Sequence, residues 1–415
     1  MKSLVSSLLF FYSISLPSQI DSSLLVSTPP DTSDTKLNMD ALQQRPFLKF
    51  SKIPISFGGY VEMNYQHMGN DGISDGHEFQ FRKLSLFTAS TISNKIKFLS
   101  ELEYEYNKSE LLEGHSPEVN VEYAALDIEL HPFLNIRSGI ILNPIGSFNQ
   151  NHDGPKWEFT ERPLSSTQML PGTFSNAGMG IYGKKYRKNW YWGYEIYLTN
   201  GFDNSIIDND KNKTYLPESK EHLARLTTSN SGSPMITSKI AIRQKNLGEI
   251  GLSYMGGIYN KWQSDGTIID DKRKVTVFAL DYNNTLPFTG TRISTEWAMI
   301  LTDIPQGYSE FYGSRQFGGF IDIVQPIIKK KLFGYDAAAI LVSLRAEYVD
   351  WNCGQFKNTN VLKGDDVWSF TGSISFRPTP LTVIRANYRY LENRDLFANP
   401  ATHTGGVSLG ISSYF

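Results

Sequence analysis

From Ile55 to Phe415, apolar and polar residues alternate in sixteen segments of strand length. In residues 381–391, for example, Arg385, Asn387 and Arg389 share one face and the residues between them are apolar or aromatic. A period of two places alternate side chains on opposite faces of a strand. Arg or Lys facing mid-bilayer lipid costs roughly 2–4 kcal/mol, so such a strand in a membrane needs one wet face and one apolar face.

The order of the connections narrows the fold further. They alternate short and long, with long connections near 68–76, 108–117, 144–176, 200–233, 261–272, 303–310, 351–365 and 392–403; the connection 326–337 departs from this rule. Outer-membrane barrels have short periplasmic turns and long outer loops. We therefore predict an all-β fold, a transmembrane antiparallel β-barrel of sixteen strands. A half-exposed soluble sheet, which gives the same alternation, is the alternative. The predicted strands are 55–67, 77–92, 95–107, 118–131, 133–143, 177–187, 190–199, 234–246, 248–260, 273–283, 288–302, 311–325, 338–350, 366–377, 381–391 and 404–415.

The chain ends on the last of these strands. Val407, Leu409 and Ile411 alternate with small or polar residues, and Phe415 is the final residue. A closed barrel must pair its last strand with its first, since otherwise both edges stay open. The segment 404–415 is therefore expected to pair with 55–67. This ending resembles the C-terminal signature of bacterial outer-membrane β-barrels, in which the terminal Phe is part of the assembly signal.

The residues before the barrel read as an export signal and a linker. Lys2 precedes a short apolar stretch from Leu4 to Leu16, which is too short to span a bilayer as a helix. We predict a signal peptide at 1–22, a flexible periplasmic lead-in at 23–54 and the barrel at 55–415; an uncleaved apolar tail is the alternative for the first part. The net charge of −2 argues against a nucleic-acid partner.

The third long connection, 144–176, is expected to fold into the lumen and to narrow it. It carries the constriction candidates Lys156, Glu158, Glu161 and Arg162. Mixed charge on opposite walls of a constriction filters ions and orients dipolar solutes. An ordinary surface loop with solvated charges is the alternative. The faces expected to line the lumen carry Arg82, Lys83, Lys97, Glu101, Glu103, Arg137, Lys239, Arg243, Arg345, Glu347, Arg385 and Arg389.

Two sequence patterns associated with enzymes are better explained as strand glycines. Residues 178–183 match G-x-G-x-x-G, and residues 406–410 match G-x-S-x-G. The first pattern needs a following helix to bind a dinucleotide, and the second needs a strand-to-helix turn to present a nucleophile. Both lie in predicted strands. We predict no enzymatic activity, no cofactor and no metal site; Lys213 stands where a calcium loop starting at Asp208 would need Gly.

Four stretches resemble the phosphate-selective porin O/P family. They are Gly58-Gly59-Tyr60-Val61; Phe81-Arg82-Lys83-Leu84-Ser85-Leu86; Asn135-Ile136-Arg137-Ser138-Gly139 leading to Asn143-Pro144-Ile145-Gly146; and Thr160-Glu161-Arg162-Pro163. The resemblance implies homotrimers and diffusion of small, often anionic solutes such as phosphate. The expected lumen residues also include the carboxylates Glu101, Glu103 and Glu347. Because these negative charges offset the Arg and Lys side chains, a weakly selective pore is favoured.

These features together predict a porin in the outer membrane of a Gram-negative-type bacterium. It would contact lipid and lipopolysaccharide and let small hydrophilic solutes or ions diffuse passively. The alternative is a surface barrel without a channel, whose outer loops bind partners in an adhesin-like or structural role. The connections 144–176 and 200–233 are long enough to plug a lumen or to present a binding surface.

Overall fold

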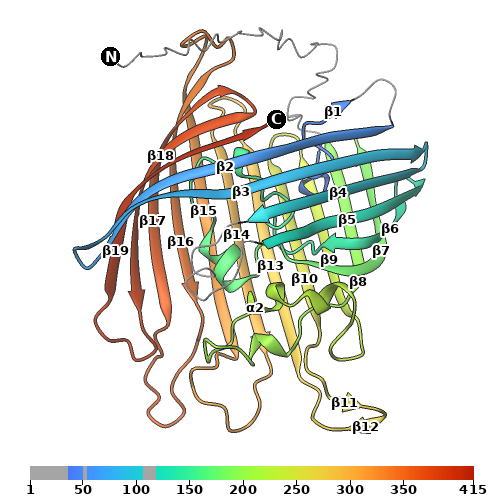
Figure 1. Cartoon of the computed structure of the whole chain (residues 1–415), viewed down its shortest axis with the longest axis vertical. Helices are drawn as coiled ribbons and strands as arrows, with labels where there is room; N and C mark the ends of the chain where they lie inside the picture. Colours follow the sequence, from blue (N-terminus) through green and yellow to red (C-terminus); the bar gives the residue numbers. More distant parts are fainter. Residues whose placement is uncertain (1–35, 50–53, 106–117) are drawn as a thin grey trace, which may run out of the picture.

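The structure is a computed structural model, which describes residues 36–49, 54–105 and 118–415. Sixteen of its strands form one closed antiparallel barrel (Figure 1), which confirms the predicted fold. The barrel strands are β2 (Ile55–Asn70), β3 (Ile73–Ser93), β4 (Ile96–Glu105), β5 (Glu118–His131), β6 (Leu134–Leu142), β7 (Ser175–Arg187), β8 (Trp190–Thr199), β9 (Met235–Gln244), β10 (Gly248–Ile258), β13 (Lys274–Thr285), β14 (Arg292–Thr302), β15 (Arg315–Lys329), β16 (Ala339–Asp350), β17 (Asp366–Thr379), β18 (Thr382–Arg394) and β19 (Thr402–Tyr414).

Each barrel strand pairs with the next one along the chain, and the last pairs with the first. The closing ladder of β19 on β2 runs from Thr404 opposite Asn70 to Tyr414 opposite Tyr60. Beyond it, the backbone N–H of Phe415 donates to the carbonyl of Gly59 at 3.0 Å. The predicted pairing of the terminal strand is confirmed, and the barrel has no open edge.

The two faces of the barrel differ in chemistry as the alternation predicts. On β19, Val407, Leu409 and Ile411 are exposed on the outer face, whereas Ser408 and Ser412 are buried on the inner face. The same division recurs around the barrel, with polar and charged side chains buried inside. An apolar exterior and a polar interior are the arrangement of an outer-membrane barrel. Among the described residues, no helix is both long enough and apolar enough to cross a membrane.

The strand ends fall into two groups, which we call the short-turn end and the long-loop end. Figure 1 shows the C-terminus and β1 (Leu48–Lys49) at the short-turn end, opposite the hairpin of β11 (Gln263–Ser264) and β12 (Thr267–Ile268). The connection after β15 lies at the short-turn end and spans residues 330–338. In outer-membrane barrels the short turns face the periplasm.

One predicted long connection is absent. We expected residues 68–76 to form a loop, but β2 and β3 continue as a ladder to a two-residue turn at Asp71-Gly72. Both residues have positive φ angles, 47° and 85°. Such a turn matches the twist of the flanking strands and favours Asp-Gly. The alternation in this hairpin continues into residues 68–76, which were predicted to form a loop.

The two glycine patterns lie in strands. Residues 178–183 are part of β7, and residues 406–410 are part of β19. Neither is followed directly by a helix, since β7 continues through a turn into β8 and residues 406–410 continue as strand to Tyr414. The contexts needed for dinucleotide binding or for a nucleophile elbow are therefore missing at both places.

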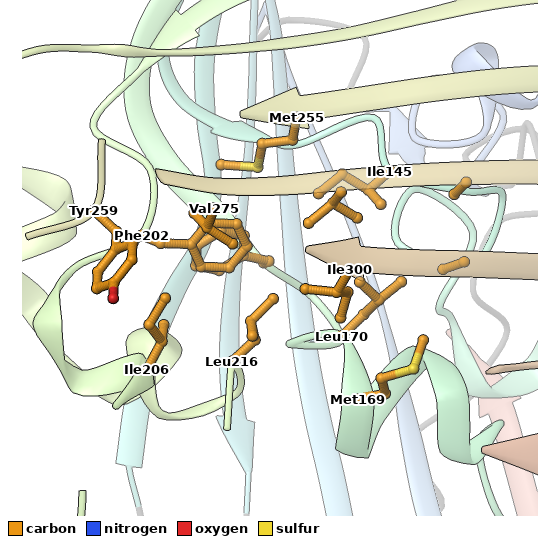
Figure 2. Packing of buried hydrophobic residues seen from close by; sticks show 14 of the residues in the cluster. Ile145, Met169, Leu170, Phe202, Ile206, Leu216, Met255, Tyr259, Val275 and Ile300 are labelled. Carbon is orange, nitrogen blue, oxygen red and sulfur yellow. The ribbon is translucent and has the colours of Figure 1, made fainter. Parts of the chain in front are cut away.

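Two loops enter the barrel from the long-loop end. The inner loop, residues 143–174, contains η2 (Gly154–Lys156) and the short π-helix η3 (Ser165–Met169). The fourth loop, residues 200–234, contains η4 (Asn204–Ile206), α2 (Glu218–Glu221) and η5 (Leu223–Leu226). Their apolar side chains meet inner-face residues of the wall, such as Val275 and Ile300, in one buried cluster (Figure 2). These packed apolar side chains cover the inner wall between β9 and β17.

The segment before the barrel is partly inside it. The predicted signal peptide, 1–22, lies outside the described residues. We expected 23–54 to be a loose lead-in; residues 36–49, which we call the N-terminal strap, instead contain η1 (Asn38–Asp40) and β1, and Leu37, Leu42 and Arg45 are buried. β1 pairs with Ser56 and Phe57 of β2. Contacts with the inner face of the barrel order this part of the chain.

Candidate functional site

The candidate site is the polar interior of the barrel, where most predicted lumen residues form buried ion pairs. Arg345 of β16 donates to both carboxylate oxygens of Asp322 on β15, at 2.7 Å each. Arg137 of β6 binds Asp127 of β5 at 2.7 and 2.9 Å. These paired guanidiniums and carboxylates are desolvated together, which lowers the cost of burying each charge.

Other buried pairs connect strands that are not adjacent. Lys239 of β9 reaches Asp281 of β13 at 2.7 Å, across β10. Arg385 of β18 reaches Glu62 of β2 at 2.6 Å, across β19. Arg389 of β18 reaches Glu347 of β16 at 3.1 Å, across β17, while Lys83 of β3 pairs with Glu103 of the adjacent β4. The predicted lumen residues thus lie on the inner face, but most of them contact other protein groups and little solvent.

A smaller set of predicted charges remains accessible to solvent. Arg82 and Glu161 face each other at 3.3 Å, and each side chain is 28% exposed. Lys97 pairs with Glu129 at 2.6 Å near the short-turn end, with half of the lysine side chain exposed. Arg243 lies 3.7 Å from Glu249. Of the predicted lumen residues, these are the ones best placed to act on a solute.

The inner loop is bound to the opposite wall through its backbone and its carboxylates. Glu158 accepts from Ser375 at 2.6 Å and Arg377 at 2.8 Å, and it also pairs with Arg292. The backbone N–H of Thr160 donates to Asn387 at 2.6 Å. Glu158 and Thr160 therefore fix the loop tip against β14, β17 and β18.

Wall carboxylates bind the same loop from other sides. Glu296 of β14 accepts from the backbone N–H groups of Ser147 and Phe148, at 2.7 and 2.9 Å. Glu347 of β16 accepts from the backbone N–H of Leu164 at 2.8 Å. Charge-assisted hydrogen bonds of this kind are about twice as strong as neutral ones. The loop is held along its whole length.

The four constriction candidates have different environments. Lys156 lies 3.2 Å from Asp153 and donates to the carbonyl of Ala41 at 3.4 Å, so it contacts the strap. Glu158 is buried among arginines, and Glu161 faces Arg82. Arg162 is partly buried beside Glu161. The four do not form one ring; of the two acidic candidates, only Glu161 has solvent access.

One group of side chains could be mistaken for a metal site. Among the described residues, Glu101, His152 and Asp153 place ligand atoms within 4.8 Å of one another. The Arg45 guanidinium lies 2.8 Å from Glu101 and 2.6 Å from Asp153. It also packs over the Phe87 ring at 4.0 Å. Arg45 therefore supplies the positive charge that these buried carboxylates need.

Sequence reasoning missed the partners of the predicted charges. The alternation of residues already indicates that these partners face the lumen, because they occupy inner-face positions of their strands: Glu62, Asp127, Asp281 and Asp322. Arg45 gave no such signal, because it precedes the first barrel strand. Its role depends on contacts with residues more than 50 positions away.

Comparison with known protein sequences finds a distant relative and no family model. No protein-family model matches the chain. An uncharacterized protein of Aquifex aeolicus (strain VF5) is 24% identical over 357 residues, which cover 80% of this chain and 75% of that protein.

Solved outer-membrane proteins share the architecture. An anion-selective porin from Comamonas acidovorans has a TM-score of 0.53 at 13% identity, covering 87% of this chain and 99% of the porin. The outer-membrane channel DcaP of Acinetobacter baumannii has a TM-score of 0.55 at 11% identity, covering 87% and 97%. OmpF of Salmonella typhi, in complex with daunomycin, has a TM-score of 0.50 at 10% identity, covering 87% and 98%. This chain therefore has a porin-like fold, a closed antiparallel barrel of sixteen strands.

Proposed function

We propose that this barrel is a porin that lets small hydrophilic solutes or ions cross the outer membrane by passive diffusion. The observation that carries the proposal is a closed sixteen-stranded wall with an apolar exterior and a charged interior, narrowed by a loop bound to the inner face. Barrels of this size have a lumen wide enough for an aqueous channel. The inner loop would leave a narrow path.

The accessible charges favour weak ion selectivity. Arg82 faces Glu161, and Lys97 faces Glu129, so each exposed cation has a carboxylate beside it. Neighbouring opposite charges largely cancel beyond a Debye length of about 8 Å at physiological ionic strength. Anions such as phosphate would then be among the solutes without being strongly selected. The resemblance to the phosphate-selective porin O/P family supports anions as solutes, and we extend it to a homotrimer surrounded by lipid and lipopolysaccharide.

A second function is favoured by one specific observation. The inner loop and the fourth loop bury Leu170, Phe202 and Ile206 against the wall in a single apolar cluster (Figure 2). Packed apolar side chains exclude water, so a stable cluster of this kind favours a barrel that is closed in its outer half. Such a barrel would act through its outer loops as a binding or structural protein.

Conductance across a planar bilayer separates the two functions. The purified full-length chain is reconstituted, and current steps and the reversal potential in a KCl gradient are recorded. Stepwise conductance with a small reversal potential is expected of a weakly selective porin. If no conductance is seen, the non-channel function is favoured, provided that the barrel is folded. Folding is verified by the heat-modifiable migration of the protein in gels.

A further inference from the structure

The N-terminal strap follows the inner face of half the barrel, close to the short-turn end. Leu37 and Met39 pack against Tyr182 of β7 and Ala241 of β9. Leu42 packs in a second cluster with inner-face residues of β4, β5 and β6. β1 then pairs with β2. The strap therefore passes along the wall from β9 back to the first barrel strand.

The wall lacks side chains where the strap lies closest. A Cβ atom at Gly193 of β8 would lie 2.5 Å from Leu37 and 2.6 Å from Met39. A Cβ atom at Gly58 of β2 would lie 2.4 Å from the carbonyl oxygen of Pro46. At Gly58 the neighbour is the strap backbone, so a side chain there would force the strap away from the wall. At Gly193 the neighbours are the side-chain ends of Leu37 and Met39, so a small residue could be accommodated, whereas a side chain as large as Leu would compete with both for the same space.

Polar contacts fasten the strap at three points. The backbone N–H of Asn38 donates to both carboxylate oxygens of Glu249 at 3.0 Å, and Asp40 pairs with Lys184. At the other end, Arg45 binds Glu101 of the wall and Asp153 of the inner loop. Arg45 is 1% exposed. The Arg45 junction joins the strap, the wall and the inner loop in one ionic cluster.

The strap and the inner loop share the inner face of the barrel. The strap lies on strands between β2 and β10. The inner loop binds β14, β16, β17 and β18, and it also reaches β3 and β8 through the contacts of Glu161 with Arg82 and of Gln150 with Glu195. They meet at Asp153 and where Lys156 donates to the carbonyl of Ala41. From this arrangement we infer that the strap is a built-in closure element, which narrows the short-turn end of the pore and is separable from the barrel wall. This inference rests on the proposed channel function.

Displacing the strap should enlarge the conductance. The first variant is Gly193→Leu, whose side chain would occupy the position of Leu37 and Met39. The second lacks residues 36–47. The control is Gly372→Leu, because a Cβ atom at Gly372 meets one neighbouring atom, at 4.0 Å. Removing the strap should widen the path at the short-turn end and increase the single-channel conductance about twofold or more.

Chemical labelling reports the strap position independently of current. Leu42→Cys is introduced into a Cys353→Ser background. The protein is then treated with a membrane-impermeant maleimide in permeabilised vesicles, so that the reagent reaches both sides of the membrane. Leu42 is buried, so its replacement should be protected when Gly193 is retained and labelled when Gly193→Leu is added.

The outcomes separate the two ideas. Closure by the strap is supported if both strap variants give larger single-channel current steps than the parent protein. It is also supported if the variants conduct and the parent protein does not. Unchanged steps in the folded deletion variant, with a conducting parent protein, overturn the inference and leave the porin function standing. Silence of the parent protein and of both folded variants contradicts the channel function itself.

Discussion

Arg385 tests whether the interior charges hold the barrel together or line a path. Its side chain is 1% exposed; it binds Glu62 at 2.6 Å and donates to the carbonyls of Gly154 and Trp157 in the inner loop, at 3.2 and 2.8 Å. Arg385→Met leaves the Glu62 carboxylate buried without this partner. Breaking a buried pair in this way costs about 3–5 kcal/mol.

The double variant Arg385→Met with Glu62→Leu separates charge burial from loop anchoring. It removes both charges, so the remaining loss comes from the two loop carbonyls and should be about 1–3 kcal/mol. Both values are measured by urea unfolding from lipid vesicles. With a slope of about 3 kcal/mol per M, the single variant lowers the midpoint by roughly 1–1.7 M. Equal losses in the single and double variants, or a single-variant loss below about 1 kcal/mol, would refute the reasoning.

Three further predictions concern other parts of the barrel. Arg82→Glu should shift the KCl reversal potential toward cations, because this side chain is accessible, whereas Lys331→Glu in an exposed turn should not; equal shifts would contradict the assignment. Burial, followed by the nearby Asp350, raises the pKa of the Cys353 thiol to about 12. Less thiolate is then present at any given pH, so alkylation by iodoacetamide should be slow at pH 8 and still accelerate above pH 10; a plateau near pH 9 would show an ordinary thiol. Gly59→Leu should reduce the heat-resistant folded fraction in gels, because its Cβ would lie 2.3 Å from the Ser85 carbonyl and 2.6 Å from the Phe415 ring, while Gly372→Leu should behave like the parent.

The strand framework could be predicted because it depends on local pattern. Alternation located all sixteen strands, and Arg345, Arg137 and Lys239 were assigned to the inner face, where the structure places them. The same pattern predicts only which face a side chain occupies. It does not determine whether water or another chain segment covers that face. Burial of Arg385 depends on Glu62 and on the inner loop, which are remote in sequence.

The N-terminal strap was beyond sequence reasoning for a different reason. Residues 23–54 have the polar composition of a linker, and composition describes how a segment behaves without partners. Leu37, Leu42 and Arg45 acquire partners from strands β3 to β9 and from the inner loop. The Asp71-Gly72 turn, by contrast, has a local sequence that favours a two-residue hairpin, so the sequence does contain the signal for this turn.

The anchoring of the inner loop has a consequence for how the barrel folds. Thr160 binds Asn387 and Ser408, which follow it by 227 and 248 residues, and Arg385 follows Glu62 by 323. These contacts cannot form until the final strands exist. Non-local contacts of this kind slow folding, because the entropy of closing the chain is lost before they are made. The contacts of the inner loop with β17, β18 and β19 therefore form late in assembly, and this part of the interior becomes fixed only after the last strands have paired.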